Sequence, residues 1–370
     1  MAQTAFEANN PLVVSVLAKE LAVEAIRSSY IGRFIGTSKS ALIQEKTNLK
    51  KSAGDTILCG LRVQLQGEGV QGDATAEGNE EAMQFYDDSI TINQLRHQVR
   101  VKGRMTEQRV PYNLREEAKD SLTDWWAERF DTAFFNQICG NTAQSDTRYT
   151  GNNSAIAPSS NRIIRAGNQA NDQSLTTSDK FDLTYIDVAR NYAETASISN
   201  STGPMVRPIK YMGSDYYVMF LHDDQVYDLR TNTSTGQWQD IQKAALMGAD
   251  VKENPIFTGA LGIYNGVVLH KASRVTPGVS SADGTAVSNT RRAVLCGAQC
   301  AAIAFGADNG PTKFTWVEEV FDYKNQFGVS AGAIFGLKKT KYIPADNSAT
   351  NAEDFGTIVV STYAARPTAA

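Results

Sequence analysis

Histidine and cysteine are scarce in this chain of 370 residues, which has three His and four Cys. Cys59 and Cys139 lie far in sequence from the close pair Cys296 and Cys300, and no His lies near that pair. Structural zinc usually needs two close pairs of ligands, and four scattered cysteines make no disulfide framework. The simplest interpretation is four reduced, mostly buried thiols in a cytoplasmic setting.

An excess of positive charge is also missing, because Lys and Arg total 36 against 40 Asp and Glu, a net charge of −4. A protein that coats nucleic acid by neutralising phosphates is normally basic, so that function is disfavoured. No apolar run reaches the roughly 18 residues of a membrane span, and residues 1–10 lack the pattern of a secretory signal. Three Asn-x-Ser/Thr matches are then predicted to be inert loop sequence: Asn152, Asn200 and Asn232.

Hydrophobic residues make up 42% of the chain and charged residues 21%, so it is predicted to be globular, with one large core or two modest ones. Gly67–Gly72 matches G-x-G-x-x-G, but the acidic, glycine-broken residues after it would repel a dinucleotide. That segment is predicted to be a flexible hairpin tip. His97 is predicted to pack on a strand, His270 lies in a predicted strand, and His222 is predicted to lie in a solvated turn rather than a metal site. We therefore expect no catalytic, cofactor-binding or metal-binding residues.

The amino-terminal segment combines a predicted helix with a cluster of large apolar residues. Asn10 and Pro11 are a typical helix start, and an apolar stripe at helical spacing follows. Four large apolar residues come next, framed by glycines: Tyr30, Ile31, Phe34 and Ile35. Exposed, they would form an aggregation-prone patch. We expect them to be buried beside a long helix, at its aromatic residues Trp126, Phe130 and Phe134.

Two strand-like segments, about 40–65 and 90–101, enclose an unusual acidic stretch. Residues 66–88 contain no Lys or Arg and these acids: Glu68, Asp73, Glu77, Glu80, Glu81, Asp87 and Asp88. The pattern predicts a long hairpin with an acidic far end, whose arms of about 15 residues project on the order of 50 Å. A lone two-stranded ribbon is barely stable in water. The hairpin therefore needs a partner surface, and at that reach another subunit is a candidate.

The base of the predicted hairpin is basic. From Leu95 to Lys102 the sequence alternates, with apolar residues and His97 on one face and polar or basic residues on the other. The cations of this region are Arg96, Arg100, Lys102, Arg104 and Arg109. They lack the interleaved aromatic residues that stack on nucleic-acid bases. We expect them to form a docking face for an acidic partner, such as the acidic hairpin of a neighbouring copy.

The strongest predicted helix runs from about Asn113 to Ile138, preceded by Pro111 and ended by Gly140, and would span roughly 39 Å. Residues 141–180 are polar and are predicted to be a loop excursion. A second compact region is predicted over 181–305. The elements predicted beyond residue 180 are helices at 182–196 and 237–247 and strands near 256–275, 293–305, 314–323, 328–342 and 357–363.

Several short sequence words occur together over roughly the first 140 residues. They are Tyr30–Gly36, Leu49–Asp55, Gly72–Glu81, Ile92–His97, Gln108–Arg109 and Trp125–Asp131. With these words and this layout, the chain resembles the major capsid proteins of tailed bacteriophages with the Hong Kong 97-type fold. It is most similar to the branch named for coliphage N-four. Each word alone is weak, but the set is specific.

The resemblance implies an α+β fold with four parts. They are an N-terminal arm at 1–55, an E-loop hairpin at 56–94, a peripheral domain at 95–180 and 306–370 with the spine helix at about 113–138, and an axial domain at 181–305. In the type member an E-loop lysine crosslinks the shell, but residues 66–88 contain no lysine. We therefore expect no self-made isopeptide bond.

The resemblance also implies a function. The chain would assemble with itself as hexamers and pentamers into the icosahedral head, which encloses double-stranded DNA without sequence-specific binding. Assembly would take place in the host bacterial cytoplasm and the protein would reside in the virion head, with no membrane. The implied partners are a separate scaffolding protein, since no long helical extension precedes Pro11, a portal protein and, as an option, a decoration protein.

Two other classes of function stay open on the residues alone. The first is another virion structural protein, although portal proteins are more helical and decoration proteins usually much shorter. The second, much less favoured, is a soluble enzyme, which would need a convergent polar site around His222 or His270.

Overall fold

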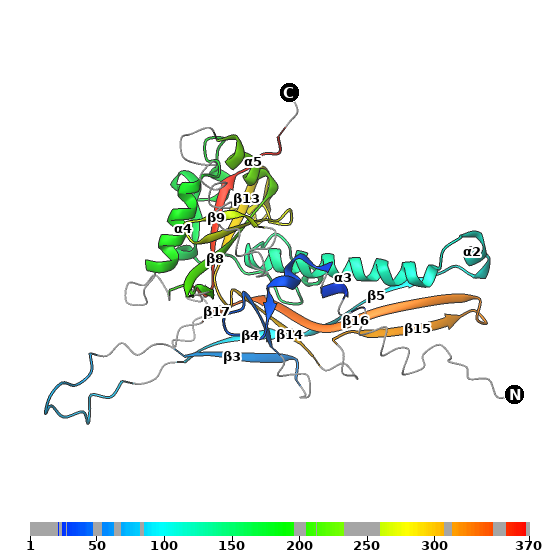
Figure 1. Cartoon of the computed structure of the whole chain (residues 1–370), viewed down its shortest axis with the longest axis horizontal. Helices are drawn as coiled ribbons and strands as arrows, with labels where there is room; N and C mark the ends of the chain where they lie inside the picture. The colour runs from blue at the N-terminus through cyan, green and yellow to red at the C-terminus, as the bar shows by residue number, and fades with distance from the viewer. Residues whose placement is uncertain are drawn as a thin grey trace.

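The computed structural model contains two β-sheets, one long helix and a projecting hairpin (Figure 1). The residues that it describes are 21, 24–26, 28–46, 54–62, 68–81, 85–195, 205–211, 213–232, 260–306, 313–342 and 353–367. Within these ranges no helix is long and apolar enough to cross a membrane. The mixture of helices and mainly antiparallel strands agrees with the α+β class predicted from the sequence.

The first sheet is built around one long strand that pairs with three others. Its members in sheet order are β1 (Ile35–Gly36), β2 (Ile43–Lys46), β14 (Ala301–Phe305), β16 (Gln326–Lys339) and β15 (Thr315–Phe321), and β5 (Asn93–Arg100) also pairs with β16. The first half of β16 lies between β15 and β5, and its end pairs with β14. The sheet therefore joins the amino-terminal arm, the segment after the hairpin and the carboxy-terminal third of the chain.

Helix α3 (Leu114–Ile138) confirms the helix predicted at about 113–138, and it packs on this sheet along β16. The Asn113 side chain caps its start by accepting the backbone N–H of Arg115, and Gly140, with φ +64°, follows its end. Trp126 and Phe130 are buried against Phe314 and Phe335 of the sheet. A short helix, α2 (Arg104–Arg109), connects β5 to this helix.

The second sheet has seven strands and lies beyond the carboxy-terminal end of α3 (Figure 1). Its members in order are β6 (Ile163–Arg165), β19 (Thr357–Tyr363), β13 (Thr290–Cys296), β8 (Ser214–Leu221), β10 (Val267–Lys271) and β9 (Ala260–Tyr264), with β7 (Ile209–Tyr211) beside β8. Helix α4 (Leu183–Thr195) buries one apolar face in the core of this sheet, and α5 (Asp223–Thr231) follows β8. The predicted helix at 237–247 lies outside the described residues.

Sheet membership divides the chain differently from the predicted ranges. The strand predicted at 293–305 is two strands in different sheets, because β13 ends at Cys296 and β14 begins at Ala301. Conversely, β19 was expected with the long helix but pairs with β13 in the second sheet. Hydrogen-bond pairing decides to which sheet a strand belongs, and order along the chain carries little information about it.

The hairpin also differs from its prediction. Its strands are β3 (Thr56–Arg62) and β4 (Phe85–Thr91), which pair antiparallel. The predicted return strand at 90–101 is wrong as one element, because pairing with β3 stops at Thr91 and β5 turns away to pair with β16. The alternation of apolar and polar residues predicted one continuous strand, but it belongs to two strands in different sheets. An alternation of every second residue indicates a strand and does not identify the strand with which it pairs.

The polar excursion at 141–180 is confirmed: apart from β6 it holds only short 3₁₀ turns. They are η3 (Thr147–Tyr149), η4 (Ser160–Arg162), η5 (Ala166–Asn168) and η6 (Asp172–Ser174). Asp172 nevertheless is fully buried and pairs with Arg292 at 2.7 Å and Arg165 at 2.8 Å. Burial raises the pKa of Asp172, but the two guanidinium groups outweigh burial and lower it.

Two small strand pairs complete the fold: β11 (Gly278–Val279) with β12 (Ala286–Val287), and β17 (Lys341–Tyr342) with β18 (Glu353–Asp354).

Candidate assembly surfaces

The acidic tip of the hairpin, residues 68–81, lies at one extreme of the molecule (Figure 1). All five acids predicted there as interface residues are exposed: Glu68, Asp73, Glu77, Glu80 and Glu81. Glu80 accepts the backbone N–H of Gly78 at 2.8 Å, which shapes a turn. No described cation forms an ion pair with the acids at positions 68, 73, 77 and 80.

The five predicted basic residues lie toward the opposite extreme, where β5 ends and α2 begins (Figure 1). All are exposed: Arg96, Arg100, Lys102, Arg104 and Arg109. None of them has an acidic partner within 4 Å in the described part of the chain. The same chain thus has an exposed acidic end and an exposed basic end.

Two of these arginines line a groove of about 820 Å³ between β5, β16 and β15, here named the basic groove. Arg96 lies across β16 at Gly332, where a Cβ would come within 2.9 Å of the arginine Cγ. Arg100 stacks on the ring of Phe321, with its guanidinium carbon 4.2 Å from the ring centre. One acid, Glu319, is also in the lining. The groove therefore presents two arginines, of which Arg100 is held by stacking, with Gln94, Gln98, Thr315 and Ser330 as further hydrogen-bonding groups.

One expectation about the acids is wrong for Asp88. The sequence grouped it with the acids that need a cation from a partner, but its carboxylate is mostly buried and pairs with Lys338 Nζ at 2.5 Å. The backbone N–H of Lys341 donates to the other carboxylate oxygen at 3.1 Å. Asp88 lies in the middle of β4, within reach of Lys338 of β16, and sequence spacing does not reveal that neighbour.

The arm seat is the place where Ser29–Phe34 contacts α3. Asp131, a buried carboxylate in the middle of that helix, accepts hydrogen bonds from Ser29 Oγ at 2.8 Å and from the backbone N–H groups of Tyr30 and Ile31 at 3.0 Å. Arg274 approaches the same carboxylate at 3.6 Å. A charged acceptor therefore holds the first turn of η1 (Tyr30–Phe34).

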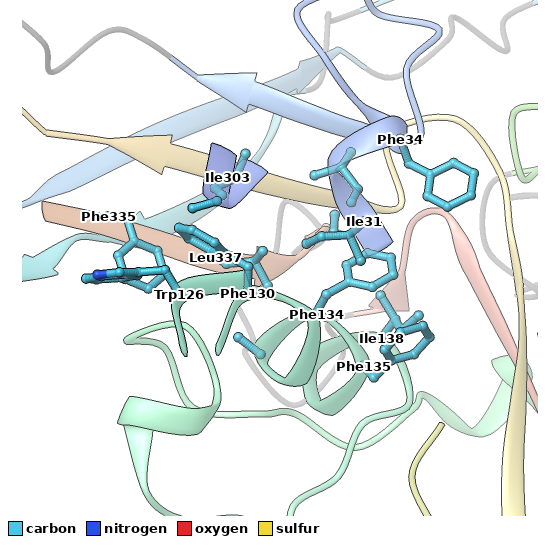
Figure 2. Close-up of a cluster of buried hydrophobic side chains, with 14 of the residues drawn as sticks. Ile31, Phe34, Trp126, Phe130, Phe134, Phe135, Ile138, Ile303, Phe335 and Leu337 are labelled. Atoms are coloured by element: carbon cyan, nitrogen blue, oxygen red, sulfur yellow. The ribbon is translucent and has the colours of Figure 1, made fainter. Parts of the chain in front are cut away.

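Ile31 and Phe34 are buried in the arm seat, and Figure 2 shows Ile31 over the side of α3 that carries Phe134 and Ile138. The Phe34 ring lies 5.4 Å from the Phe220 ring and 5.3 Å from His270. The seat lies closer to the carboxy-terminal end of α3 than expected. The reason is that Trp126 and Phe130 already pack against Phe314 and Phe335.

Tyr30 and Ile35 occupy the margins of the seat. Tyr30 packs edge-on against Phe220, and its hydroxyl is buried with no hydrogen-bond partner in the described residues. Burial, the largest effect, raises the pKa of Tyr30; Arg33 opposes the shift and Asp131 adds to it. Ile35 is half-buried and begins β1 opposite Ile43.

The three histidines have structural surroundings. His97 stacks on Trp125, with ring centres 4.4 Å apart. His222 is not in a solvated turn, as the sequence suggested, but caps α5 by accepting the backbone N–H of Asp224 at Nδ1. Burial and the nearby Arg291 lower its pKa, which favours the neutral imidazole that this bond requires. His270 is buried in the arm seat.

No group of three or more His, Cys, Asp or Glu side chains suited to a metal occurs in the described ranges. Cys139, Cys296 and Cys300 are buried free thiols, as predicted. Burial raises the pKa of Cys139 and Cys296, which makes both poor nucleophiles. The residues that sequence reasoning missed are the buried polar ones, Asp131 above all, because nothing in a helical pattern distinguishes a carboxylate that will meet backbone N–H groups from a solvated one.

Comparison with known proteins agrees with this geometry. A family model described as phage capsid protein matches residues 5–366. The major capsid protein of Pseudomonas phage KPP25 is 28% identical over 370 residues, which cover 91% of each chain. The capsid of Ralstonia phage GP4 is 32% identical with a TM-score of 0.80, over 92% of this chain and 93% of that one. The capsid of cyanophage Pam1 shares the fold at 20% identity and a TM-score of 0.68, over 92% of this chain and 94% of that one. The chain belongs to the phage capsid protein family.

Proposed function

We propose that this phage major capsid protein joins its neighbours head to tail, with the acidic tip of one copy against the basic groove of the next. Copies joined in this way close into the hexamers and pentamers of an icosahedral head. The observation that carries the proposal is the position of the tip and the groove near opposite ends of one molecule, with opposite charge (Figure 1).

Geometry favours a contact between copies over a contact within one. The hairpin points away from the end of the molecule where β5, β15 and α2 lie (Figure 1), so a copy directs its tip away from its own groove. A contact between two different surfaces on identical copies is heterologous, and such contacts generate closed rings when the rotation between copies closes. Hexamers and pentamers are rings of this kind.

The chemistry of the two surfaces fits. Lys102, Arg104 and Arg109 extend the positive surface from the groove onto α2, so an acidic segment can pair beyond the two groove arginines. A partly exposed pair is worth only about 0–1 kcal/mol. Several such pairs at every subunit contact give assembly a salt-dependent contribution that a single subunit lacks.

Charge reversal tests the docking. Glu77→Lys with Glu80→Lys and Glu81→Lys is expected to lower the yield of closed shells at least tenfold, because like charges then face each other. The variant Arg96→Glu with Arg100→Glu is expected to do the same, and the combined variant to recover part of the yield. Asp120→Lys with Asp124→Lys, on the exposed side of α3, is the matched control. Normal shells from both reversed variants would contradict the docking.

The finer family placement is also a proposal. We propose a Hong Kong 97-type fold, with an arm at about 1–55, an E-loop at about 56–94, a peripheral domain on α3 and the first sheet, and an axial domain on the second sheet. We place the chain in the branch named for coliphage N-four. The long helix on a sheet, the hairpin and the sequence words at 30–36, 72–81 and 125–131 support both. Electron microscopy of assembled shells would test the arrangement of the four parts.

We propose that the protein is structural, with no enzymatic activity, and that it resides in the virion head after assembly in the host cytoplasm. A separate scaffolding protein, a portal protein and, as an option, a decoration protein would be its partners. Co-expression with and without the scaffolding protein, followed by negative-stain microscopy, tests the first of these. Closed shells of uniform diameter are expected only with the scaffolding protein.

The shell is proposed to enclose DNA without binding it tightly. The net charge is −4, and the basic groove is assigned to contacts between copies. A surface that neutralised many phosphates would give adhesion with a steep salt dependence. Emptied shells are expected to retain little DNA at moderate salt, as measured by sedimentation with labelled fragments, and strong retention would contradict this proposal.

A further inference from the structure

The root of the hairpin, residues 88–92, is where β4 ends and the chain passes into β5. Its geometry matters for docking because a small angular error there grows along the hairpin. The paired part alone, seven residues from Phe85 to Thr91, is about 23 Å long, so an error of about 10° moves its far end by about 4 Å. That displacement is as large as an ion-pair distance, and the tip extends farther still.

A single amide side chain forms hydrogen bonds with both the backbone N–H and the carbonyl oxygen of the last residue of β4. Asn153 Oδ1 accepts the backbone N–H of Thr91 at 3.0 Å, and Asn153 Nδ2 donates to the carbonyl oxygen of Thr91 at 2.9 Å. The same Nδ2 lies 3.3 Å from the carbonyl oxygen of Leu337, in β16. Thr91 is also the register partner of Thr56 in β3. Asn153 thus acts as a second partner for the last residue of β4.

The other side of Asn153 is attached to the long helix. Gln137, fully buried near the end of α3, donates from Nε2 to the carbonyl oxygens of Asn153 at 2.8 Å and Thr150 at 2.7 Å. Its Oε1 accepts the backbone N–H of Lys339 at 3.4 Å. A continuous path of hydrogen bonds therefore runs from the last turn of α3 through Asn153 to Thr91.

Close backbone contact makes the root sensitive to position. A Cβ on Gly336 of β16 would overlap the carbonyl oxygen of Thr91, so the two backbones cross without a side chain between them. Asn152, with φ +63°, donates to the carbonyl oxygens of Phe335 at 2.8 Å and Asn93 at 3.2 Å, which holds the start of β5. The asparagine that matched a glycosylation pattern thus has a structural role.

A second attachment holds the root at Asp88 and Ser89. Lys338 Nζ contacts both the Asp88 carboxylate at 2.5 Å and the carbonyl oxygen of Ser89 at 2.7 Å. Ile57, Ile90 and Ile92 form a small apolar cluster with alanines of β14, separate from the main core. This cluster holds the hairpin root against the first sheet by apolar contact. Because the alanine side chains are small, the contact does little to fix the angle of the hairpin, and that angle therefore depends on the polar contacts.

We infer that Asn153 is a positioning residue for assembly: by joining Gln137 of α3 to Thr91, it sets the direction in which the hairpin leaves the subunit. The Asp88–Lys338 pair holds the same root at a second point. The inference builds on the proposed docking of the hairpin on a neighbour, but its structural part concerns one subunit alone.

Hydrogen exchange of the unassembled full-length chain tests the structural part. Asn153→Ala is expected to speed amide exchange over residues 85–93 at least tenfold and to leave residues 114–138 unchanged. Asn161→Ala is the matched control, because this amide lies in the same excursion and bonds Glu353, which is not a residue of the hairpin. Lys338→Met, which removes the second attachment, is expected to give the same local increase if Asn153→Ala does not fold.

Assembly provides the second measurement. Asn153→Ala shells, viewed by negative stain, are expected to form at several-fold lower yield and with a broader range of diameters than those of the parent and of Asn161→Ala. Unchanged exchange at 85–93 in both root variants, or shells of normal yield and diameter from Asn153→Ala, would overturn the inference. Reversed acids at the tip should lower the yield of shells at least tenfold without changing exchange at 85–93, so failure of the docking proposal is distinguishable.

Discussion

The arm seat and the acidic tip are the two segments that stood out most in the sequence, and they have opposite surroundings. In the arm seat Ile31 is fully buried, Phe34 is 4% exposed, and Asp131 accepts three hydrogen bonds from the arm. At the tip, every acid from Glu68 to Glu81 is exposed. The large apolar side chains of the arm are packed within their own chain, whereas the acids of the tip are exposed on the surface of the subunit.

The difference follows from the physical range of the two interactions. Burial of a large apolar side chain against any closely packed surface contributes about 1.5–3 kcal/mol to stability, and α3 provides such a surface next to the arm. Exposed carboxylates gain at most about 1 kcal/mol each from a cation, and only where one is held in place. Subunit stability is therefore expected to depend on the arm seat, and contact between subunits on the tip.

Removal of the Phe34 ring should have the largest effect. Phe34→Ala leaves a cavity among Phe220, His270 and Tyr30, and is expected to lower the free energy of unfolding by about 3–5 kcal/mol. Denaturant unfolding of the unassembled chain measures it. Leu58→Ala, on the hairpin and 71% exposed, is the control and should change stability by less than about 0.5 kcal/mol. A Phe34→Ala chain that unfolds like the parent would show that the arm is only a linker.

Loss of the Asp131 carboxylate should come next. Asp131→Ala leaves Ser29 Oγ and the backbone N–H groups of Tyr30 and Ile31 without their acceptor, and is expected to cost about 2–3 kcal/mol in unfolding free energy. Asp124→Ala, an exposed aspartate on the same helix, is the control and should be nearly neutral. Equal effects of the two substitutions would mean that Asp131 does not hold the arm.

Added salt should weaken the contact made by the acidic tip and have little effect on the arm seat. Between 0.1 M and 1 M salt the screening length falls from about 10 Å to about 3 Å, so tip–groove contacts worth about 0–1 kcal/mol per pair should weaken. Assembly followed by light scattering is expected to slow several-fold, while unfolding of the unassembled chain changes little. Assembly that is insensitive to salt would argue against an electrostatic contact at the tip.

The smallest expected effect has the opposite sign. The buried Tyr30 hydroxyl lacks a hydrogen-bond partner in the described residues, and a buried unsatisfied polar group costs about 1–3 kcal/mol. Tyr30→Phe removes it and keeps the ring, so thermal unfolding should show unchanged stability or a gain of about 1 kcal/mol. Clear destabilisation would reveal a partner for the hydroxyl and so sharpen the description of the seat.

Local sequence patterns were reliable where one element satisfies its own requirements. The helix predicted from about Asn113 to Ile138 is α3, because its Asn113 cap and the left-handed Gly140 act within one turn of helix. The alternation of Leu95 and Val99 against Arg96 and Arg100 also appeared as predicted, since the pleat of a strand imposes it whatever the partner is.

Pairing was not predictable in the same way. The single strand expected at 90–101 became two strands in separate structures, and β14 and β19 exchanged sheets relative to expectation. Asp88 was grouped with the exposed acids although Lys338 neutralises it from 250 residues away. Each miss concerns a partner that is distant along the chain, for which residue spacing holds no signal.

By itself the sequence determined the long helix, the acidic and basic segments and the apolar character of the arm, because these depend on composition and short-range periodicity. Only the tertiary structure decided that Asp131 receives the arm, that Gly332 lets Arg96 lie across β16 in the basic groove, and that Asn153 joins α3 to the hairpin root. The physical reason is that a hydrogen bond or an ion pair depends on distances of a few ångströms between residues that the fold, and not the order of the chain, brings together.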